Sequence, residues 1–154
     1  MITVTHTSPN LITEIDQFGG CTGMGVLFFS NNDYSMCKVV NAIYDLDLED
    51  DEIISVSRLY DEEIIKEIIE DVYSIFNKEI SEEEAEELLD ASLSIFDMVD
   101  DYDCAGEFDW KMQGYQATCA RKMGYIACEG TDENGAVWMI KMDDNLLARM
   151  QLRK

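Results

Sequence analysis

This 154-residue sequence offers little from which a metal or disulfide site could be built. It contains one histidine, His6, and five cysteines, no two of which are spaced as Cys-x-x-Cys. Structural zinc sites need clusters of cysteine and histidine, so we expect no metal site. An odd number of cysteines without paired spacing indicates free thiols in a reducing compartment. Stability must therefore come from a packed core, which the 47% hydrophobic composition permits.

Leader and membrane segments are also missing. The chain does not start with a positively charged stretch and an apolar run, and no apolar run approaches the roughly 18 residues of a membrane span. Neither the Gly-x-x-x-x-Gly-Lys-Ser/Thr phosphate loop nor the Gly-x-Ser-x-Gly nucleophile motif occurs. We therefore expect a cytoplasmic protein without membrane association, and outside these two enzyme classes.

Positive charge is scarce, because 11 basic residues stand against 33 acidic ones and the formal net charge is −22. The imbalance is local: residues 45–107 hold 24 acids and three bases, whereas the rest of the chain is nearly neutral. Phosphates repel such a protein, so we expect no direct binding of nucleic acid. A basic surface on a partner protein would attract it, and many such surfaces bind nucleic acid.

Hydrophobic periodicity predicts an α+β domain. Strands are expected at 1–6, 26–30, 38–48, 125–128 and 136–142, and helices at 61–77, 81–99 and 108–123, with a further short helix beginning near Asn10. Asp61 is a plausible helix cap, and Ser81 with Glu84 forms a capping box. Proline is confined to Pro9, and no linker divides the chain. We therefore expect a single domain over 1–154, with an acidic helical segment inserted at about 49–107.

Four features could carry chemistry, and each has an ordinary structural alternative. His6 and the hydroxyls after it could be a plain strand end. The glycine-rich loop at 18–25, the strand at 26–30 and Tyr34 could bind a flat ligand, or be a loop and core aromatics. The acids from Glu129 to Glu133 precede an Asn-Gly hairpin signal, which is good turn chemistry whatever the function. The acidic helices could simply be a solvated face, although their charge exceeds what solubility needs.

Short motifs in a fixed order extend over essentially the whole chain. They are His6-Thr7-Ser8-Pro9, Leu11, Ile12, Ile15, Phe18-Gly19, Phe28-Phe29-Ser30, Tyr34, Trp110, Gln113, Ala117, Ala120, Met123-Gly124-Tyr125, Asp132-Glu133-Asn134-Gly135 and Trp138-Met139-Ile140. This ordered set resembles the mono-ADP-ribosyltransferases of the small phage type. It is most similar to a phage-encoded anti-CRISPR family that ADP-ribosylates the type I-F CRISPR-Cas surveillance complex in the bacterial host.

The resemblance implies a small ADP-ribosyltransferase-like fold in which two short antiparallel sheets form a cleft for NAD+, the substrate. The cofactor-binding residues would be His6, Thr7, Ser8, Phe28, Phe29, Ser30 and Tyr34. The backbone of Thr7 would bind the nicotinamide amide, and His6 would hold the adenosine-side ribose or the diphosphate. Phe29 and Tyr34 would pack against nicotinamide and its ribose.

The resemblance also implies a catalytic carboxylate. Cleavage of the glycosidic bond produces an oxocarbenium-like ribose, which a carboxylate stabilises. Match to the family motif places this role on Asp132, with Glu133 and Glu129 as alternatives. The best-known transferases of this broad fold have a glutamate directly before the last core strand, where this chain has Gly135, and the Glu-x-Glu pair of the arginine-modifying enzymes is missing. The missing pair disfavours arginine as the acceptor. The resemblance itself implies asparagine, in the subunit that reads the PAM, where modification would block binding of target DNA.

Two other interpretations stay open on the sequence. A non-enzymatic inhibitor could use the acidic segment as a DNA mimic that occupies a basic nucleic-acid-binding surface. That interpretation explains the charge but leaves the ordered motifs unused. A structural or regulatory phage protein with an unknown partner is the third possibility.

Overall fold

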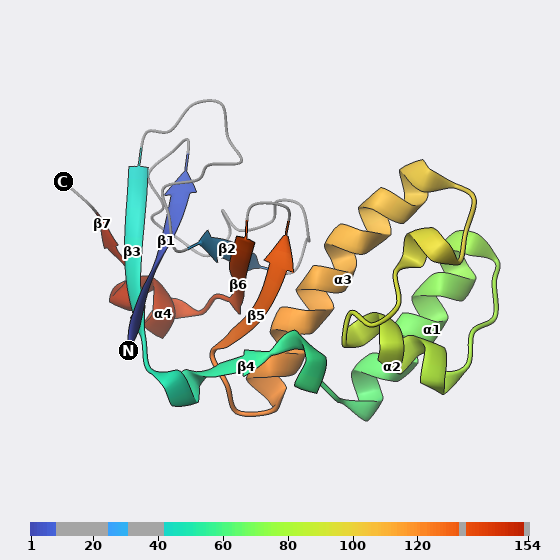
Figure 1. Ribbon diagram of the computed structural model, residues 1–154, viewed down its shortest axis with the longest axis horizontal. Helices are drawn as coiled ribbons and strands as arrows, with labels where there is room; N and C mark the ends of the chain where they lie inside the picture. Colours follow the sequence, from blue (N-terminus) through green and yellow to red (C-terminus); the bar gives the residue numbers. More distant parts are fainter. Residues whose placement is uncertain (9–24, 31–41, 133–134, 153–154) are drawn as a thin grey trace.

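The computed structural model describes residues 1–8, 25–30, 42–132 and 135–152, and within them the strands form one seven-stranded sheet (Figure 1). The strands are β1 (Ile2–Ser8), β2 (Val26–Ser30), β3 (Ala42–Leu48), β4 (Ile53–Ser55), β5 (Ala127–Asp132), β6 (Gly135–Lys141) and β7 (Gln151–Leu152). Their order across the sheet is β4-β5-β6-β2-β1-β3-β7. The pair β4–β5 is parallel and the others are antiparallel. The predicted α+β class is confirmed.

The expectation of two separate sheets is wrong for the described part of the chain, but the connection between the two halves is narrow. β1 pairs with β3 along its whole length, and β2 pairs with β6 along its whole length. Between β1 and β2 the register comprises one Cα pair, Thr5 with Ser30. Two half-sheets, β4-β5-β6-β2 and β1-β3-β7, thus meet at this β1–β2 junction. They join because strand edges that would otherwise expose backbone groups satisfy one another there.

Local capping chemistry sets where α1 (Glu62–Phe76) and α2 (Glu82–Leu89) begin. The Asp61 carboxylate accepts from the backbone N–H of Ile64 at 3.0 Å, as predicted. Ser81 and Glu84 form the predicted capping box, with each side chain accepting from the other residue's backbone. At the other end of α1, Asn77 takes a left-handed conformation with φ 52°, which stops the helix.

Two helix boundaries differ from the prediction. α2 ends at Leu89 rather than near residue 99, because Asp90 turns its carboxylate onto the backbone N–H and hydroxyl of Ser92, at 3.0 and 2.6 Å. α3 (Tyr102–Lys122) begins well before residue 108, because Asp101 caps it by accepting from the N–H of Cys104 at 3.2 Å. The first turns of α3 lack the apolar periodicity on which the prediction relied. The short β4, β7 and α4 (Asp144–Arg149) were not predicted at all.

The sheet separates two hydrophobic cores. On one face, α3 packs on β5 and β6, and α1 and α2 pack on the far side of α3 (Figure 1). This core includes Ile64, Ile68, Val72, Leu88, Leu89, Phe108, Cys128 and Met139. The opposite face carries the second core, to which α4 contributes Leu146 and which includes Val4, Phe29, Leu46, Trp138 and Ile140. α3 is therefore the element that holds the acidic helices to the sheet.

Three side chains of α3 fasten α1 through polar contacts. The Tyr115 hydroxyl donates to the Asp71 carboxylate, and Lys111 Nζ lies 2.9 Å from the same oxygen. Lys122 Nζ lies 3.0 Å from Asp61 and 3.1 Å from Glu63 at the start of α1. Cations from α3 thus neutralise part of the negative charge of α1 where the two helices meet.

Replacement of Asp71 by alanine should lower the free energy of unfolding by about 1–3 kcal/mol, because the partly buried Tyr115 hydroxyl and the Lys111 ammonium both lose their partner. Urea unfolding followed by circular dichroism measures the change. Glu67→Ala is the matched control, since it removes an exposed acid from the same helix. Equal effects of the two substitutions would contradict the role of Asp71.

Candidate functional site

His6 lies on β1 beside the β1–β2 junction, and a hydrogen bond fixes its imidazole. Its Nδ1 lies 2.8 Å from the backbone oxygen of Phe28. A carbonyl oxygen can only accept, so Nδ1 carries the proton and Nε2 is the acceptor of the neutral ring. Burial lowers the pKa of His6 below its ordinary value of 6.5, although the bond to the Phe28 carbonyl opposes the shift. His6 is therefore neutral at pH 7.

The ring of Phe29 supports His6 from the neighbouring strand. Their ring centroids are 5.5 Å apart, with an interplanar angle of 49°. Phe29 is only 1% exposed and belongs to the second core. In the sheet register His6 is opposite Tyr44 of β3, and Phe29 is opposite Trp138 of β6, so four rings form a row across the sheet. The indole N–H of Trp138 is buried without a hydrogen-bond partner in the described part of the chain.

Phe28 faces the other way, because successive side chains of a strand point to opposite faces. It packs edge-to-face on Trp110 of α3, with centroids 5.5 Å apart. Ser30 ends β2, opposite both Thr5 and Val137. The structure therefore brings His6, Phe28, Phe29 and Ser30 together at the junction, but it places Phe28 and Phe29 on opposite faces.

Other predicted residues are placed less completely. Thr7 and Ser8 continue β1 beyond the junction, opposite Ile43 and Ala42 of β3. Tyr34 and Glu133 lie outside the described residues, as do most of the glycine-rich loop and the short helix expected near residue 10.

Asp132 ends β5 at the hairpin between β5 and β6. It pairs with Gly135, which has φ 114°, a conformation that favours glycine. The hairpin is confirmed, and its register places Gly135 in β6 rather than in the turn. Val137 is opposite both Gly130 and Ser30, so the β5–β6 hairpin and the C-terminal end of β2 lie at the same end of these neighbouring strands. Glu129 is half-buried, opposite Trp138.

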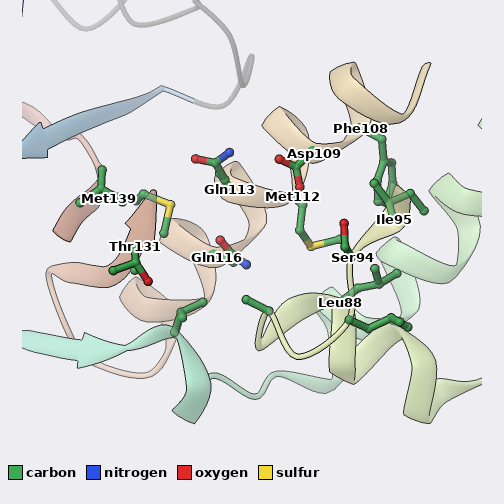
Figure 2. A pocket seen from close by; sticks show the side chains of 15 residues that line it. Leu88, Ser94, Ile95, Phe108, Asp109, Met112, Gln113, Gln116, Thr131 and Met139 are labelled. Carbon is green, nitrogen blue, oxygen red and sulfur yellow. The ribbon is translucent and has the colours of Figure 1, made fainter. Parts of the chain in front are cut away.

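A cavity of about 460 Å³ lies between α3, the β5–β6 hairpin and the segment that follows α2 (Figure 2). Most of its lining is apolar, and its polar side chains are Ser94, Asp109, Gln113, Gln116 and Thr131. Asp109, Gln113 and Gln116 occupy i, i+4 and i+7 of α3 and so share one face of the helix. That polar stripe within an apolar helix face is visible in the sequence, but helical periodicity alone does not indicate that it lines a cavity.

Polar contacts inside the cavity are few and specific. Gln116 is buried, and its Nε2 donates to the backbone oxygen of Leu89 at 3.1 Å, which ties α3 to the end of α2. Burial raises the pKa of the Asp109 carboxyl, and a hydrogen bond with the Gln113 side chain opposes the shift. Asp109 and Gln113 thus lie one helical turn apart on the same wall of the cavity.

Two of the described cysteines, Cys119 and Cys128, are free and buried. Burial raises the pKa of Cys119 to about 11 and that of Cys128 to about 12, so these thiols are protonated and unreactive at neutral pH. Within the described ranges, no three histidine, cysteine or acidic side chains are grouped to hold a metal ion. Among the helices that the structure describes, none is both long and apolar enough to cross a bilayer.

Comparison with known proteins gives one family and one fold. Residues 28–149 match the family model described as anti-CRISPR type I-F ADP-ribosyltransferase AcrIF11. This span begins within β2 and contains the acidic helices, α3 and the hairpin, whereas β1 and His6 precede it. Among curated proteins nothing matches. A solved structure described as the crystal structure of an anti-CRISPR protein has the same fold, with a TM-score of 0.53 and 18% identity over 99% of this chain and 93% of that one.

The single histidine allows the state of His6 to be measured without ambiguity. An NMR titration of its imidazole should give a midpoint below 6.5, because burial disfavours the charged ring. The unfolded chain then binds the proton more readily than the folded one, so the contribution of His6 to stability is present above about pH 6.5 and is lost as the pH falls. His6→Gln should remove that part of the pH dependence in urea unfolding. A midpoint at or above 6.5 would contradict the neutral, donating assignment.

Proposed function

The chain belongs to the anti-CRISPR type I-F ADP-ribosyltransferase family, and we propose that it transfers ADP-ribose from NAD+ to an asparagine of the PAM-reading subunit of a surveillance complex. Membership makes the protein an NAD+-dependent mono-ADP-ribosyltransferase whose target is a CRISPR-Cas complex. The proposal adds the acceptor, the subunit and the residues of the site. Modification there would block the binding of target DNA. The family match, which includes the hairpin of Asp132, is the observation that carries it.

We place NAD+ where the two half-sheets meet. A continued β1–β2 ladder would put Thr7 opposite Phe28, but the register stops before that pair and the His6 ring takes the Phe28 carbonyl. This supports a role for the Thr7 backbone edge in binding the nicotinamide amide. A neutral His6 with Nε2 as acceptor suits a ribose hydroxyl, which donates, better than a diphosphate, which does not. Of the two roles considered for His6, we therefore favour the adenosine-side ribose.

The aromatic residues divide their roles by face. Phe29, which was expected to pack against nicotinamide, is 1% exposed, so we assign it to holding the His6 ring. Phe28 is half-buried against Trp110 and stays a candidate for contact with NAD+. Ser30, at the junction, stays a candidate for a hydrogen bond to it. By their match to the family motif, Ser8 stays a candidate contact and Tyr34 a candidate to pack against nicotinamide and its ribose.

Asp132 is our choice for the catalytic carboxylate. When the glycosidic bond breaks, nicotinamide leaves with the bonding electrons and positive charge develops on the ribose. A carboxylate held close by stabilises that charge and orients the 2′-hydroxyl. Asp132 of β5 and Ser30 of β2 lie at the same end of the central strands, which supports this role. Glu133 and Glu129 are the alternatives; Glu129 pairs with Trp138, three positions before Asp132.

The acidic helices would find the target. Exposed acids of α1 and α2 lie on the far side of α3 from the sheet, away from the proposed NAD+ site (Figure 1). They are Glu62, Glu63, Glu67, Glu70, Glu82, Glu83 and Glu86. Attraction to a basic DNA-binding surface would speed encounter and fix orientation. The same acids favour the second candidate, a DNA mimic that inhibits stoichiometrically, and dependence on NAD+ separates the two functions.

Replacement of Asp132 by alanine should reduce transfer by about 10²–10³-fold, the usual cost of losing one charge-stabilising group. Intact mass spectrometry of the surveillance complex, after incubation with NAD+, measures the ADP-ribose added. Asp103→Ala, at an exposed position of α3, is the matched control. Labelling by Asp132→Ala at the wild-type rate would transfer the role to Glu129 or Glu133, whose alanine variants belong in the same series. Equimolar inhibition without NAD+ would favour the mimic.

Three acidic-to-amide changes on the helices, Glu67→Gln, Glu70→Gln and Glu83→Gln, should slow modification by about tenfold at low ionic strength and less at high salt. NAD+ binding, followed by thermal shift, should not change. The control set is Asp50→Asn, Asp51→Asn and Asp144→Asn, which removes the same charge from exposed positions outside α1 and α2. Equal slowing by both sets would mean that net charge, rather than this surface, governs the encounter.

A further inference from the structure

The residues that line the cavity beside α3 are different from those assigned above to NAD+, but the cavity adjoins that site. His6 and Phe29 lie on the other face of the sheet, among the residues of the second core. The cavity lies on the helical face, and Asp109, Gln113 and Gln116 all project from one side of α3 toward it (Figure 2). Its volume of about 460 Å³ is within the roughly 300–1,000 Å³ range of ligand pockets. A specific occupant is therefore worth seeking.

Its position connects the cavity to the reaction. Gly130 and Thr131 of β5 line it, and the next residue along the strand is Asp132. Val137, which also lines it, is opposite Ser30 of β2. A group held in the cavity would thus lie against the hairpin that carries the proposed catalytic carboxylate. An acceptor side chain must approach the ribose in this neighbourhood.

Chemistry of the wall restricts the occupant. Gln116 is already committed to the Leu89 carbonyl. Asp109 and Gln113 remain on the α3 wall, with Ser94 and Thr131 elsewhere in the lining, as polar groups that a guest can engage. Apolar side chains such as Met112, Val137 and Met139 surround them. A charged guest would lose hydration that these few polar groups restore poorly. A neutral group with both donor and acceptor atoms suits such a wall.

We propose that this cavity receives the primary carboxamide of the acceptor asparagine, with Asp109 and Gln113 as its hydrogen-bond partners. The inference rests on the proposed function, which supplies the asparagine. A carboxyl and a carboxamide make two complementary hydrogen bonds when the carboxyl is protonated, and burial favours that form of Asp109. Nicotinamide carries the same carboxamide, but the Thr7 edge is the place proposed for it. The cavity also exceeds one side chain in volume, so a residue flanking the asparagine would fit.

Kinetics of three variants test the proposal. Asp109→Leu removes the hydrogen-bonding group, Asp109→Asn keeps a donor and an acceptor, and Gln113→Leu removes its neighbour. We expect Asp109→Leu and Gln113→Leu to lower the rate of modification at limiting target by about 10–100-fold, through a higher KM for the target. The KM for NAD+ should not change, and Asp109→Asn should stay within about threefold of wild type, since volume and hydrogen-bonding capacity are kept. Asp103→Leu, at an exposed position of the same helix, is the control.

A binding measurement that needs no transfer completes the test. N-acetyl-asparagine methylamide is titrated into the ¹⁵N-labelled protein, with N-acetyl-aspartate methylamide and nicotinamide as the comparison ligands. We expect the asparagine compound to shift the side-chain amide signals of Gln113 and Gln116, the aspartate compound not to, and Asp109→Leu to abolish the shift. Folding of each variant is checked by its amide spectrum, and Gln113→Leu serves if Asp109→Leu does not fold.

Three outcomes would overturn the proposal: no shift with the asparagine compound, shifts caused by nicotinamide instead, or a raised KM for NAD+ in the variants. The two proposals can fail separately. If the wild-type protein binds the asparagine compound in the cavity but modifies no surveillance complex, the proposed function is wrong and the cavity assignment stands. If the protein modifies its target but does not bind the compound, and the Asp109 variants modify the target at the wild-type rate, the cavity assignment is wrong and the proposed function stands.

Discussion

Repulsion among the acids of residues 45–107 is the constraint that the rest of the structure has to meet. Few basic residues are present to offset this charge, and two lysines of α3 contact the acids of α1. Lys111 contacts Asp71 in the middle of α1, and Lys122 contacts Asp61 and Glu63 at its start. Both act where α1 meets α3, so the solvent-facing side of the acidic helices keeps its charge. Neutralisation is concentrated where packing requires it.

Two arginines likewise connect other elements to the sheet. Arg121 of α3 contacts Asp143 at 2.6 Å and donates to the Lys141 carbonyl at 2.8 Å, which fixes the end of β6 and the cap of α4. Arg149 of α4 contacts Glu52 and the Asp47 carbonyl, which fixes the turn after β3. Each of these guanidinium groups joins segments far apart in sequence. A small number of basic residues thus determines how the helices sit on the two faces.

Local signals in the sequence were sufficient for some elements and not for others. The strand 26–30 and the starts of both acidic helices were predicted correctly, because a buried apolar run, Asp61 and the Ser81–Glu84 box act within a few residues. The end of α2 was not, because Asp90 turns back on Ser92 in competition with a helical pattern that continues to residue 99. The single sheet was not foreseen, since pairing of Thr5 with Ser30 is a tertiary event. For the candidate site, the ordered motifs named His6 and Asp132 through their resemblance to the family. The proton position on His6 and the placement of Asp109 at a cavity wall depend on neighbours that no local pattern specifies.

The strand order also governs when this protein can acquire its fold during synthesis. β2 is completed at Ser30, yet its partner β6 ends at Lys141, so their ladder spans most of the chain. One edge of an apolar strand must therefore wait, unpaired, while more than a hundred residues are made. Contacts so distant in sequence form slowly, and an open apolar edge invites association between chains. The segment made in between is the acidic one, whose helices α1 and α2 pack on each other locally. Like charges on these segments repel one another, and such repulsion would disfavour association of unfinished chains before the last strands are made.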